Sequence, residues 1–348
     1  MRRISRITVA GAATASLALA LSACGGTSSE SSSESKGDKG LAIAYDVGGK
    51  GDQSFNDAAY AGLEKAKKEF GYETADVEPT EGETDADKQQ RLESLAKQGY
   101  NPVVGVGYAY ASAVKGAAEK FPNTTFGIVD DSTVEADNVA DLVFSEEEAS
   151  YLAGVAAAKS TESNVVGFVG GVDIPLIHKF QAGFAQGVKD TNPKVKVLSQ
   201  YLTQTAEEGG FSSPDKGKSA AEGQIEKKAD VVYAAAGLSG QGVIQAAAAN
   251  EVWAIGVDSD QYKQEALAKY KDSILTSAMK DVAKAVYNLA KSVEDGKPET
   301  GIVRGDLKSG EVSLSNSNPK FADNAELQEA IETAKKKIID GEIKVKSS

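Results

Sequence analysis

The densest group of side chains that could do chemistry lies between Tyr45 and Asn56. An apolar run ends at Asp46, a glycine-rich loop follows, and Ser54 stands at the expected N-cap of a helix before Phe55. This pattern predicts a strand, a loop and a helix that presents Phe55 in its first turn beside the Asp46 carboxylate. An exposed aromatic near carboxylates and an amide suits a ligand with a flat ring to which a polyhydroxylated group is attached. Phe55 as a hydrophobic plug under the loop fits the same pattern equally well.

Clusters of acidic residues and glycines follow most of the other apolar runs as well. Asp130 follows one run, Gly237 begins a glycine-rich segment after another, and Asp258 follows a third. A single glycine in such a place is explained by a tight turn. Ligands of open α/β sheets, however, bind at the carboxyl ends of the strands. The recurrence of polar residues at these ends therefore predicts a ligand-binding cleft.

Histidine and cysteine, on which the common hydrolases and zinc sites depend, occur only once each. His178 is the single histidine and Cys24 the single cysteine, whereas catalytic triads and conventional zinc sites draw on these residue types. Gly217-Lys218-Ser219 has the end of a phosphate-binding loop, but Ser212 replaces its leading glycine. We therefore expect no catalytic residues, no metal and no cofactor, and we expect His178 on a helix surface or at the rim of the cleft. An enzyme that uses paired carboxylates stays an alternative, because aspartates are frequent at the predicted strand ends.

The N-terminus has the layout of a secretory signal. Arginines precede an apolar stretch, and Leu21-Ser22-Ala23-Cys24 resembles the bacterial lipobox, in which the cysteine is diacylated and becomes the mature N-terminus. Residues 1–23 are predicted to be a lipoprotein signal peptide, and 24–39, rich in Ser, Gly and Glu, a flexible tether. The protein is expected on the extracytoplasmic face of the cell membrane. An ordinary signal peptide with an incidental cysteine is the alternative.

Charge and length narrow the class of protein further. The formal net charge is −13 over 348 residues, and removal of the signal arginines makes the mature chain more negative. This acidic balance argues against nucleic acid as a partner. Beyond the tether, the chain exceeds the usual size of a single core, so two lobes are expected.

Short apolar runs alternate with helical stretches along this remaining part. Strands of this length between helices are typical of βαβ units and parallel sheets, and Ser145 after Phe144 is predicted to cap the helix that opens the second lobe. The predicted strands are 41–47, 74–77, 102–106, 125–129, 139–144, 165–169, 195–202, 231–236, 252–257 and 274–278, and helices are expected at 56–70, 87–98, 146–159, 176–189, 243–250 and 281–294.

Several segments resemble one known family. DVGGKGDQSFND (46–57) resembles the signature segment of the basic membrane protein family of bacterial lipoproteins, which are purine nucleoside receptor A-like, and the resemblance continues in the family's order to Lys291. It implies a type I periplasmic-binding-protein fold with two doubly wound, Rossmann-like lobes and a ligand cleft between them. We expect the N-terminal lobe to hold 40–143 with about 279–303, and the C-terminal lobe 144–278 with about 304–348.

The resemblance also implies roles for residues of the ligand pocket. Phe55 matches an aromatic that stacks on a base, Asn56 the amide beside it, and Gly237 a glycine whose backbone lies against the ligand. A second stacking aromatic is expected from the other lobe; Tyr233 is the candidate, although a tyrosine within a strand fits a core position equally well. The chain departs from the family at Tyr108, where Phe is frequent.

The charged residues of the pocket are assigned by the same resemblance. Asp46, Asp130 and Asp258 match carboxylates near the ligand, and Asp258 is the candidate for the ribose hydroxyls. Lys280 matches a lysine at the end of the last cleft strand.

The resulting prediction is a monomeric, lipid-anchored solute-binding protein that captures nucleosides, purine nucleosides foremost, for the permease subunits of an ABC importer. One alternative is a binding protein of the same fold for a sugar or a signalling molecule. The other is a surface enzyme that processes nucleosides.

Overall fold

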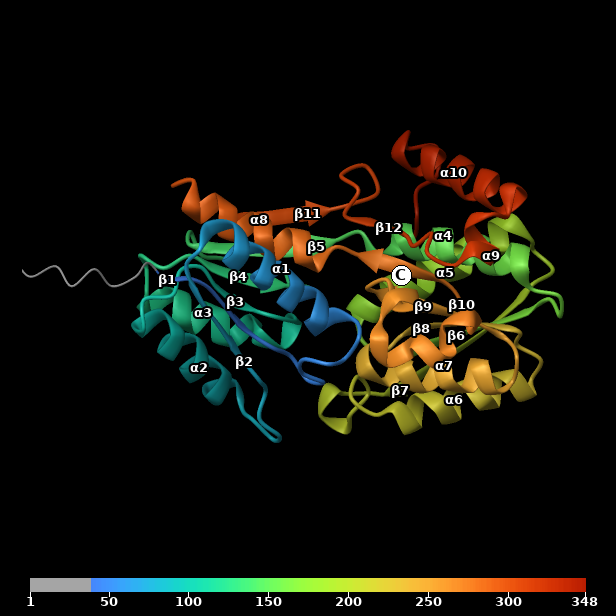
Figure 1. The fold of residues 1–348 in the computed structure, drawn as a ribbon, viewed down its shortest axis with the longest axis horizontal. Coiled ribbons are helices and arrows are strands. Elements are labelled where there is room, and N and C mark those ends of the chain that lie inside the picture. The colour runs from blue at the N-terminus through green and yellow to red at the C-terminus, as the bar shows by residue number, and fades with distance from the viewer. Residues whose placement is uncertain (1–38) are drawn as a thin grey trace, which may run out of the picture. The chain divides into compact units, whose positions relative to one another are not determined.

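The computed structural model describes residues 39–348. The predicted signal peptide (1–23) and the predicted tether, apart from Lys39, lie outside the described residues, as does the lipidation candidate Cys24. Within 39–348, no helix is both long enough and apolar enough to cross a membrane. Two six-stranded sheets organise this part of the chain (Figure 1).

The first sheet is wholly parallel, in the order β11-β5-β4-β3-β1-β2. Helices α1 and α8 pack against one of its faces, and α2 and α3 pack against the other. Successive β1 residues alternate between these two cores, Ile43 in one and Ala44 in the other, as a strand covered on both faces requires. The elements are β1 (Lys39–Ala44), α1 (Phe55–Phe70), β2 (Glu73–Val77), α2 (Asp85–Lys97), β3 (Val103–Gly105), α3 (Ala111–Lys120), β4 (Phe126–Val129), β5 (Val139–Phe144), α8 (Val282–Glu294) and β11 (Gly301–Gly305).

The second sheet has the order β12-β10-β9-β8-β6-β7 and is parallel except for β12, which runs antiparallel to β10. Helices α4 and α5 pack against each other, as do α6 and α7, and α10 packs on α4. The elements are α4 (Glu146–Ser160), β6 (Val165–Val172), α5 (Pro175–Thr191), β7 (Lys196–Thr203), α6 (Pro214–Glu226), β8 (Val231–Ala235), α7 (Gly240–Ala249), β9 (Trp253–Asp258), β10 (Ile274–Lys280), β12 (Val312–Leu314), α9 (Pro319–Ala322) and α10 (Ala325–Ile339).

The chain passes between the two sheets after β5, after β10 and after β11. The predicted fold, two doubly wound α/β lobes, is confirmed by these sheets and the helices on them. Strand β10 runs on to Lys280, so Met279 and Lys280 pair in the second sheet, although the expected boundary placed them with the first lobe. The exact lobe boundaries stay a prediction. Strands β11 and β12 were not among the predicted strands.

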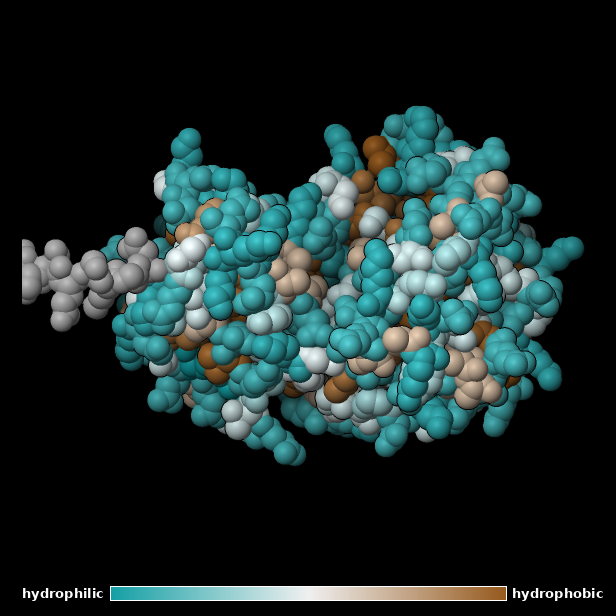
Figure 2. Space-filling view, in the orientation of Figure 1, coloured by the Kyte–Doolittle hydropathy of each residue, from teal (hydrophilic) through white to brown (hydrophobic). Residues whose placement is uncertain are grey.

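Polar side chains dominate the face of the molecule in Figure 2, and hydrophobic residues form small, separate areas there. Ile302 on β11 and Ile339 at the end of α10 are the large hydrophobic side chains that are most exposed among the described residues. The larger apolar side chains otherwise lie in the cores beside the sheets, or they line the cavity described next.

Candidate ligand-binding cleft

A cavity lies where the carboxyl ends of the strands of the two sheets meet. Ligands of open α/β folds bind at such strand ends. The cavity is lined from both lobes by Asp46, Val47, Asp52, Phe55, Asn56, Gly107, Tyr108, Asp130, Leu176, Ile177, Phe180, Phe211, Ala235, Ala236, Gly237, Val257, Asp258 and Lys280.

The loop between β1 and α1 is organised by Asp52 rather than by the predicted cap Ser54. The Asp52 carboxylate accepts hydrogen bonds from the backbone N–H groups of Ser54 (2.9 Å) and Asn56 (2.8 Å) and from Nδ2 of Asn56 (3.0 Å). Burial raises the pKa of Asp52 to about 6, although these backbone hydrogen bonds act to lower it. Ser54 makes no side-chain cap. Held by Asp52 in this way, the loop places Phe55, the first residue of α1, in the wall of the cavity.

Asp46 lines the cavity from the first lobe, and hydrogen bonds to its backbone and to its side chain hold it in place. Its N–H donates to Oδ1 of Asn56 (3.0 Å), and its Oδ1 accepts from the N–H of Val47 (2.8 Å). Burial raises the pKa of Asp46 to about 7. Gly107 has φ +103°, and a Cβ there would lie 2.3 Å from Oδ2 of Asp46. The carboxylate therefore needs glycine at this position.

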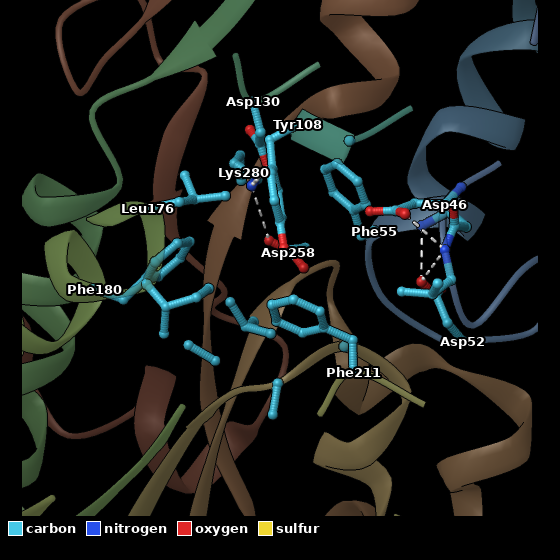
Figure 3. A pocket seen from close by; sticks show the side chains of 18 residues that line it. Asp46, Asp52, Phe55, Tyr108, Asp130, Leu176, Phe180, Phe211, Asp258 and Lys280 are labelled. Atoms are coloured by element: carbon cyan, nitrogen blue, oxygen red, sulfur yellow. Dashed lines mark hydrogen bonds and ion pairs between the residues drawn. The ribbon is translucent and has the colours of Figure 1, made fainter. Parts of the chain in front are cut away.

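Lys280 lies between two carboxylates that come from different lobes, as Figure 3 shows. Its Nζ is 2.6 Å from Oδ2 of Asp130 and 3.6 Å from Oδ1 of Asp258. Burial alone would lower the pKa of Lys280, but attraction to Asp130, Asp258 and Glu146 outweighs burial and raises it. Lys280 is therefore a buried cation, 4% exposed.

Both carboxylates retain an oxygen that nothing in the described chain binds by a hydrogen bond. Oδ1 of Asp130 and Oδ1 of Asp258 are buried acceptors without a hydrogen-bond partner. Both residues also have left-handed backbone, with φ +67° and +61°. Such conformations cost about 1–3 kcal/mol in a residue other than glycine, and they cluster at ligand sites. Strand ends built in this way present acceptors to a ligand that brings hydrogen-bond donors.

Apolar side chains form the remaining walls. Phe55 extends from the first lobe, Leu176 and Phe180 come from α5 of the second lobe, and Phe211 comes from the loop after β7 (Figure 3). Nζ of Lys280 is 4.7 Å from the ring centre of Phe55 and 5.5 Å from that of Phe180, within the range of a cation–π interaction. The cavity thus joins aromatic faces to a charged end.

The structure brings all the predicted pocket residues to this cavity except Tyr233. Tyr233 is fully buried; its ring packs on Phe168 and Phe184 at 5.6 and 5.3 Å, and its hydroxyl bonds Oγ of Ser150 (3.1 Å). Its side chain points from β8 toward α4 and α5, so the core interpretation of this tyrosine is correct and the pocket assignment is wrong.

Phe180 and Phe211 are the second-lobe aromatics of the cavity that sequence reasoning missed. Phe180 lies in a helix that was predicted, but its inward direction depends on tertiary packing. Phe211 lies in an irregular loop without any periodic signal. Tyr108 lines the cavity as well, and burial raises the pKa of its phenol to about 12, so the hydroxyl keeps its proton.

His178 lies on α5 outside the cavity lining, with a side chain 38% exposed and Nε2 2.6 Å from Oδ1 of Asp173. This is a helix-surface position, as predicted. In residues 39–348, no group of three or more His, Cys, Asp or Glu side chains is arranged to hold a metal ion.

Comparisons with known proteins match this chain along almost its whole length. The family described as ABC transporter substrate-binding protein, PnrA-like, matches residues 40–348. The ABC transporter nucleoside-binding protein BmpA of Lactococcus lactis subsp. cremoris is 35% identical, with 98% of each chain covered. Basic membrane protein A of Borreliella burgdorferi is 31% identical, with 85% of each chain covered.

A solved structure agrees with the sequence comparison. A solute-binding protein of an ABC transporter system from Aeropyrum pernix superposes with a TM-score of 0.76 at 28% identity, and the match covers 89% of this chain and 94% of that one. The resemblance deduced from the cleft motifs is therefore confirmed: the chain belongs to the PnrA-like family of ABC transporter substrate-binding proteins.

Proposed function

We propose that this substrate-binding protein captures nucleosides, purine nucleosides foremost, in the cleft between its lobes and delivers them to the permease subunits of an ABC importer. The base is held against the ring of Phe55, and the sugar lies at the charged end formed by Asp130, Asp258 and Lys280. Closure of the two lobes around the ligand sequesters it and presents a new surface to the permease.

The observation that carries this proposal is the pair of carboxylate oxygens that receive no hydrogen bond, inside a cavity with aromatic walls. A buried acceptor without a donor is unfavourable by about 1–3 kcal/mol, so Oδ1 of Asp130 and Oδ1 of Asp258 favour a ligand with hydroxyl groups. Phe55, Phe180 and Phe211 favour a ligand with a flat apolar part. A nucleoside joins these two parts in one molecule. The relative from Lactococcus lactis, named for nucleoside binding, supports the same ligand class.

The charges of the cavity favour a ligand without phosphate. Lys280 is the single cation among the residues that line it, and Asp130 and Asp258 already share its charge. A phosphate group would meet these carboxylates and Asp46 without a free cation. We therefore propose nucleosides rather than nucleotides.

Two alternative functions, a sugar-binding protein and a nucleoside-processing enzyme, fit this chain less well. A simple sugar uses the carboxylates but leaves much of the aromatic wall without a partner. A nucleoside-processing enzyme needs a nucleophile or an acid–base group at the reacting bond, whereas the family and the named relatives are described as binding proteins. We propose binding without catalysis.

The mature protein is proposed to be a monomer that is anchored through diacylated Cys24 on the extracytoplasmic face of the cell membrane. This proposal rests on the lipobox-like Leu21–Cys24 and the polar segment that follows. Two acyl chains anchor a protein stably, whereas one binds only marginally. Relatives in Pyrococcus that are named lipoproteins support it.

Mass spectrometry of the small molecules released when the purified protein is denatured tests the proposed ligand. The expected result is an intact nucleoside, which the protein returns unchanged after incubation. Release of a sugar would favour the first alternative, and conversion of an added nucleoside to its free base would favour the enzyme.

A further inference from the structure

A second set of contacts joins the two lobes beside the cavity. Oγ of Ser54, in the first lobe, donates to Oδ2 of Asp258 (2.7 Å), and Oγ of Ser259 donates back to the carbonyl of Ser54 (2.7 Å). Nε2 of Gln261 donates to the carbonyl of Gln53 (3.1 Å). Ser54, Ser259 and Gln261 are absent from the cavity lining. These three residues, with Gln53, are called the latch below.

Gln261 is the most firmly held member of the latch. It is 1% exposed, its Oε1 accepts from the N–H of Val257 (3.2 Å), and its own N–H donates to Oγ of Ser277 (3.2 Å). A Cβ on Gly256 would lie 2.4 Å from this Oε1, so a glycine makes room for the amide. One end of the amide is therefore bound to the end of β9, next to Asp258, and the other end reaches across to the first lobe.

The latch connects two residues whose backbone is strained. Gln53, on the first-lobe side, has φ +57°, and Asp258, on the second-lobe side, has φ +61°. Such conformations persist where surrounding contacts over-determine them. The hydrogen bonds of Gln261 and Ser54 end at, or next to, these two residues, and they supply contacts that exist only while the lobes are together.

We propose that Gln261 and Ser54 are positioning residues: without touching the ligand, they hold the lobes closed and fix the Asp258 carboxylate in the orientation that receives it. The identity of the ligand rests on the proposed function, but the latch itself does not. If the latch sets the fraction of closed protein, its loss weakens every ligand of the cleft by the same factor, because apparent affinity scales with the population of the competent state.

The test compares Gln261→Ala, Gln261→Glu and the control Gln224→Ala with the wild-type protein. Gln261→Glu keeps the size and the acceptor for Val257 but places an oxygen against the Gln53 carbonyl. Gln224 is likewise a buried glutamine, its Nε2 donates to the carbonyl of Phe168 (2.9 Å) within the second lobe, and it belongs neither to the latch nor to the cavity lining. Guanosine and adenosine are the probes, binding kinetics and solution X-ray scattering of ligand-free protein are the readouts, and thermal unfolding reports folding.

Both Gln261 variants should bind either nucleoside about tenfold more weakly, because a buried hydrogen bond across the closed interface is lost. The loss should appear mainly as faster dissociation, and the ligand-free variants should be less compact than wild type. Gln224→Ala should lower thermal stability and leave affinity and compactness unchanged. If Gln261→Glu matches wild type in affinity, or if Gln224→Ala loses as much affinity as the Gln261 variants, the positioning role is wrong.

Failure of the proposed function gives a different result. A wild-type protein that binds no nucleoside refutes the ligand class, and the scattering of ligand-free protein then tests the latch by itself. Equal compactness of wild type and Gln261→Ala would overturn the inference whatever the ligand is.

Discussion

Asp258→Ala is the change that tests how the cleft recognises the sugar. The substitution removes Oδ1, the buried acceptor without a hydrogen bond, and Oδ2, which accepts a hydrogen bond from Ser54. Lys280 retains Asp130 at 2.6 Å and so stays paired. Hydrogen bonds to charged groups are worth about 1.5–3 kcal/mol. The loss of one ligand hydrogen bond should therefore weaken a nucleoside by about 10- to 150-fold.

Titration calorimetry with guanosine, 2′-deoxyguanosine and guanine measures this effect. Asp258→Ala should reduce the affinity for guanosine most, that for the deoxynucleoside less and that for the free base least. The loss common to all three ligands reflects the latch contact between Ser54 and Asp258, and the additional loss for guanosine reflects the ribose hydroxyl groups. Asp141→Ala is the matched control, because Asp141 is a buried carboxylate on β5 outside the cavity lining. The control should leave all three affinities unchanged.

Equal losses for the three ligands would mean that Asp258 only supports the closed arrangement of the lobes through Ser54 and does not bind the sugar. The ribose assignment would then be withdrawn.

Three further predictions concern the cleft, and a fourth concerns the N-terminal sequence. Phe55→Ala should weaken nucleosides by about 1–3 kcal/mol, the value of a base stacked on an aromatic ring, with little change in melting temperature; unchanged affinity with a large fall in melting temperature would identify a core residue. Phe211→Ala should weaken nucleosides, whereas Tyr233→Phe, which removes only the core hydrogen bond to Ser150, should change stability and not affinity; the reverse pattern in calorimetry and thermal unfolding would contradict the corrected assignment. Burial raises the pKa of Asp46 from 3.8 to about 7, so the folded state binds the proton more tightly than the unfolded state. This contribution to stability is present at low pH and is lost as the pH rises through 7. Asp46→Asn should therefore flatten the decline of the ligand-free melting temperature between about pH 4 and 7, and a slope equal to that of wild type would refute the raised pKa of Asp46. Cys24→Ala should leave unprocessed precursor or protein released from the membrane, and an unacylated N-terminus in the mature wild type, seen by mass spectrometry, would contradict anchoring.

The strands, and the polar residues at their carboxyl ends, were predictable because the sequence patterns that indicate them are local. Apolar runs such as Val139–Phe144 coincide with β5, and the polar residues that follow such runs, Asp130 and Asp258 among them, lie at the carboxyl ends of the parallel strands. Strand β11 was missed because it is short and exposed and depends on pairing with β5 across a long sequence separation.

The directions of individual side chains were less predictable. Ser54 fits an N-cap by type and position, yet the Asp52 carboxylate bonds the free N–H groups of the helix, which releases the Ser54 hydroxyl for Asp258. Tyr233 belongs to a correctly predicted strand, but the direction of its side chain is decided by packing on Phe168 and Phe184 in the core.

Titration calorimetry of the purified protein with guanosine, adenosine, guanine, ribose and guanosine monophosphate shows whether the cleft binds a whole nucleoside. We expect saturable binding of one nucleoside per chain, and much weaker binding of the free base, the sugar and the nucleotide. If ribose or the nucleotide binds as tightly as the nucleosides, or if no nucleoside binds, the proposed ligand class is wrong.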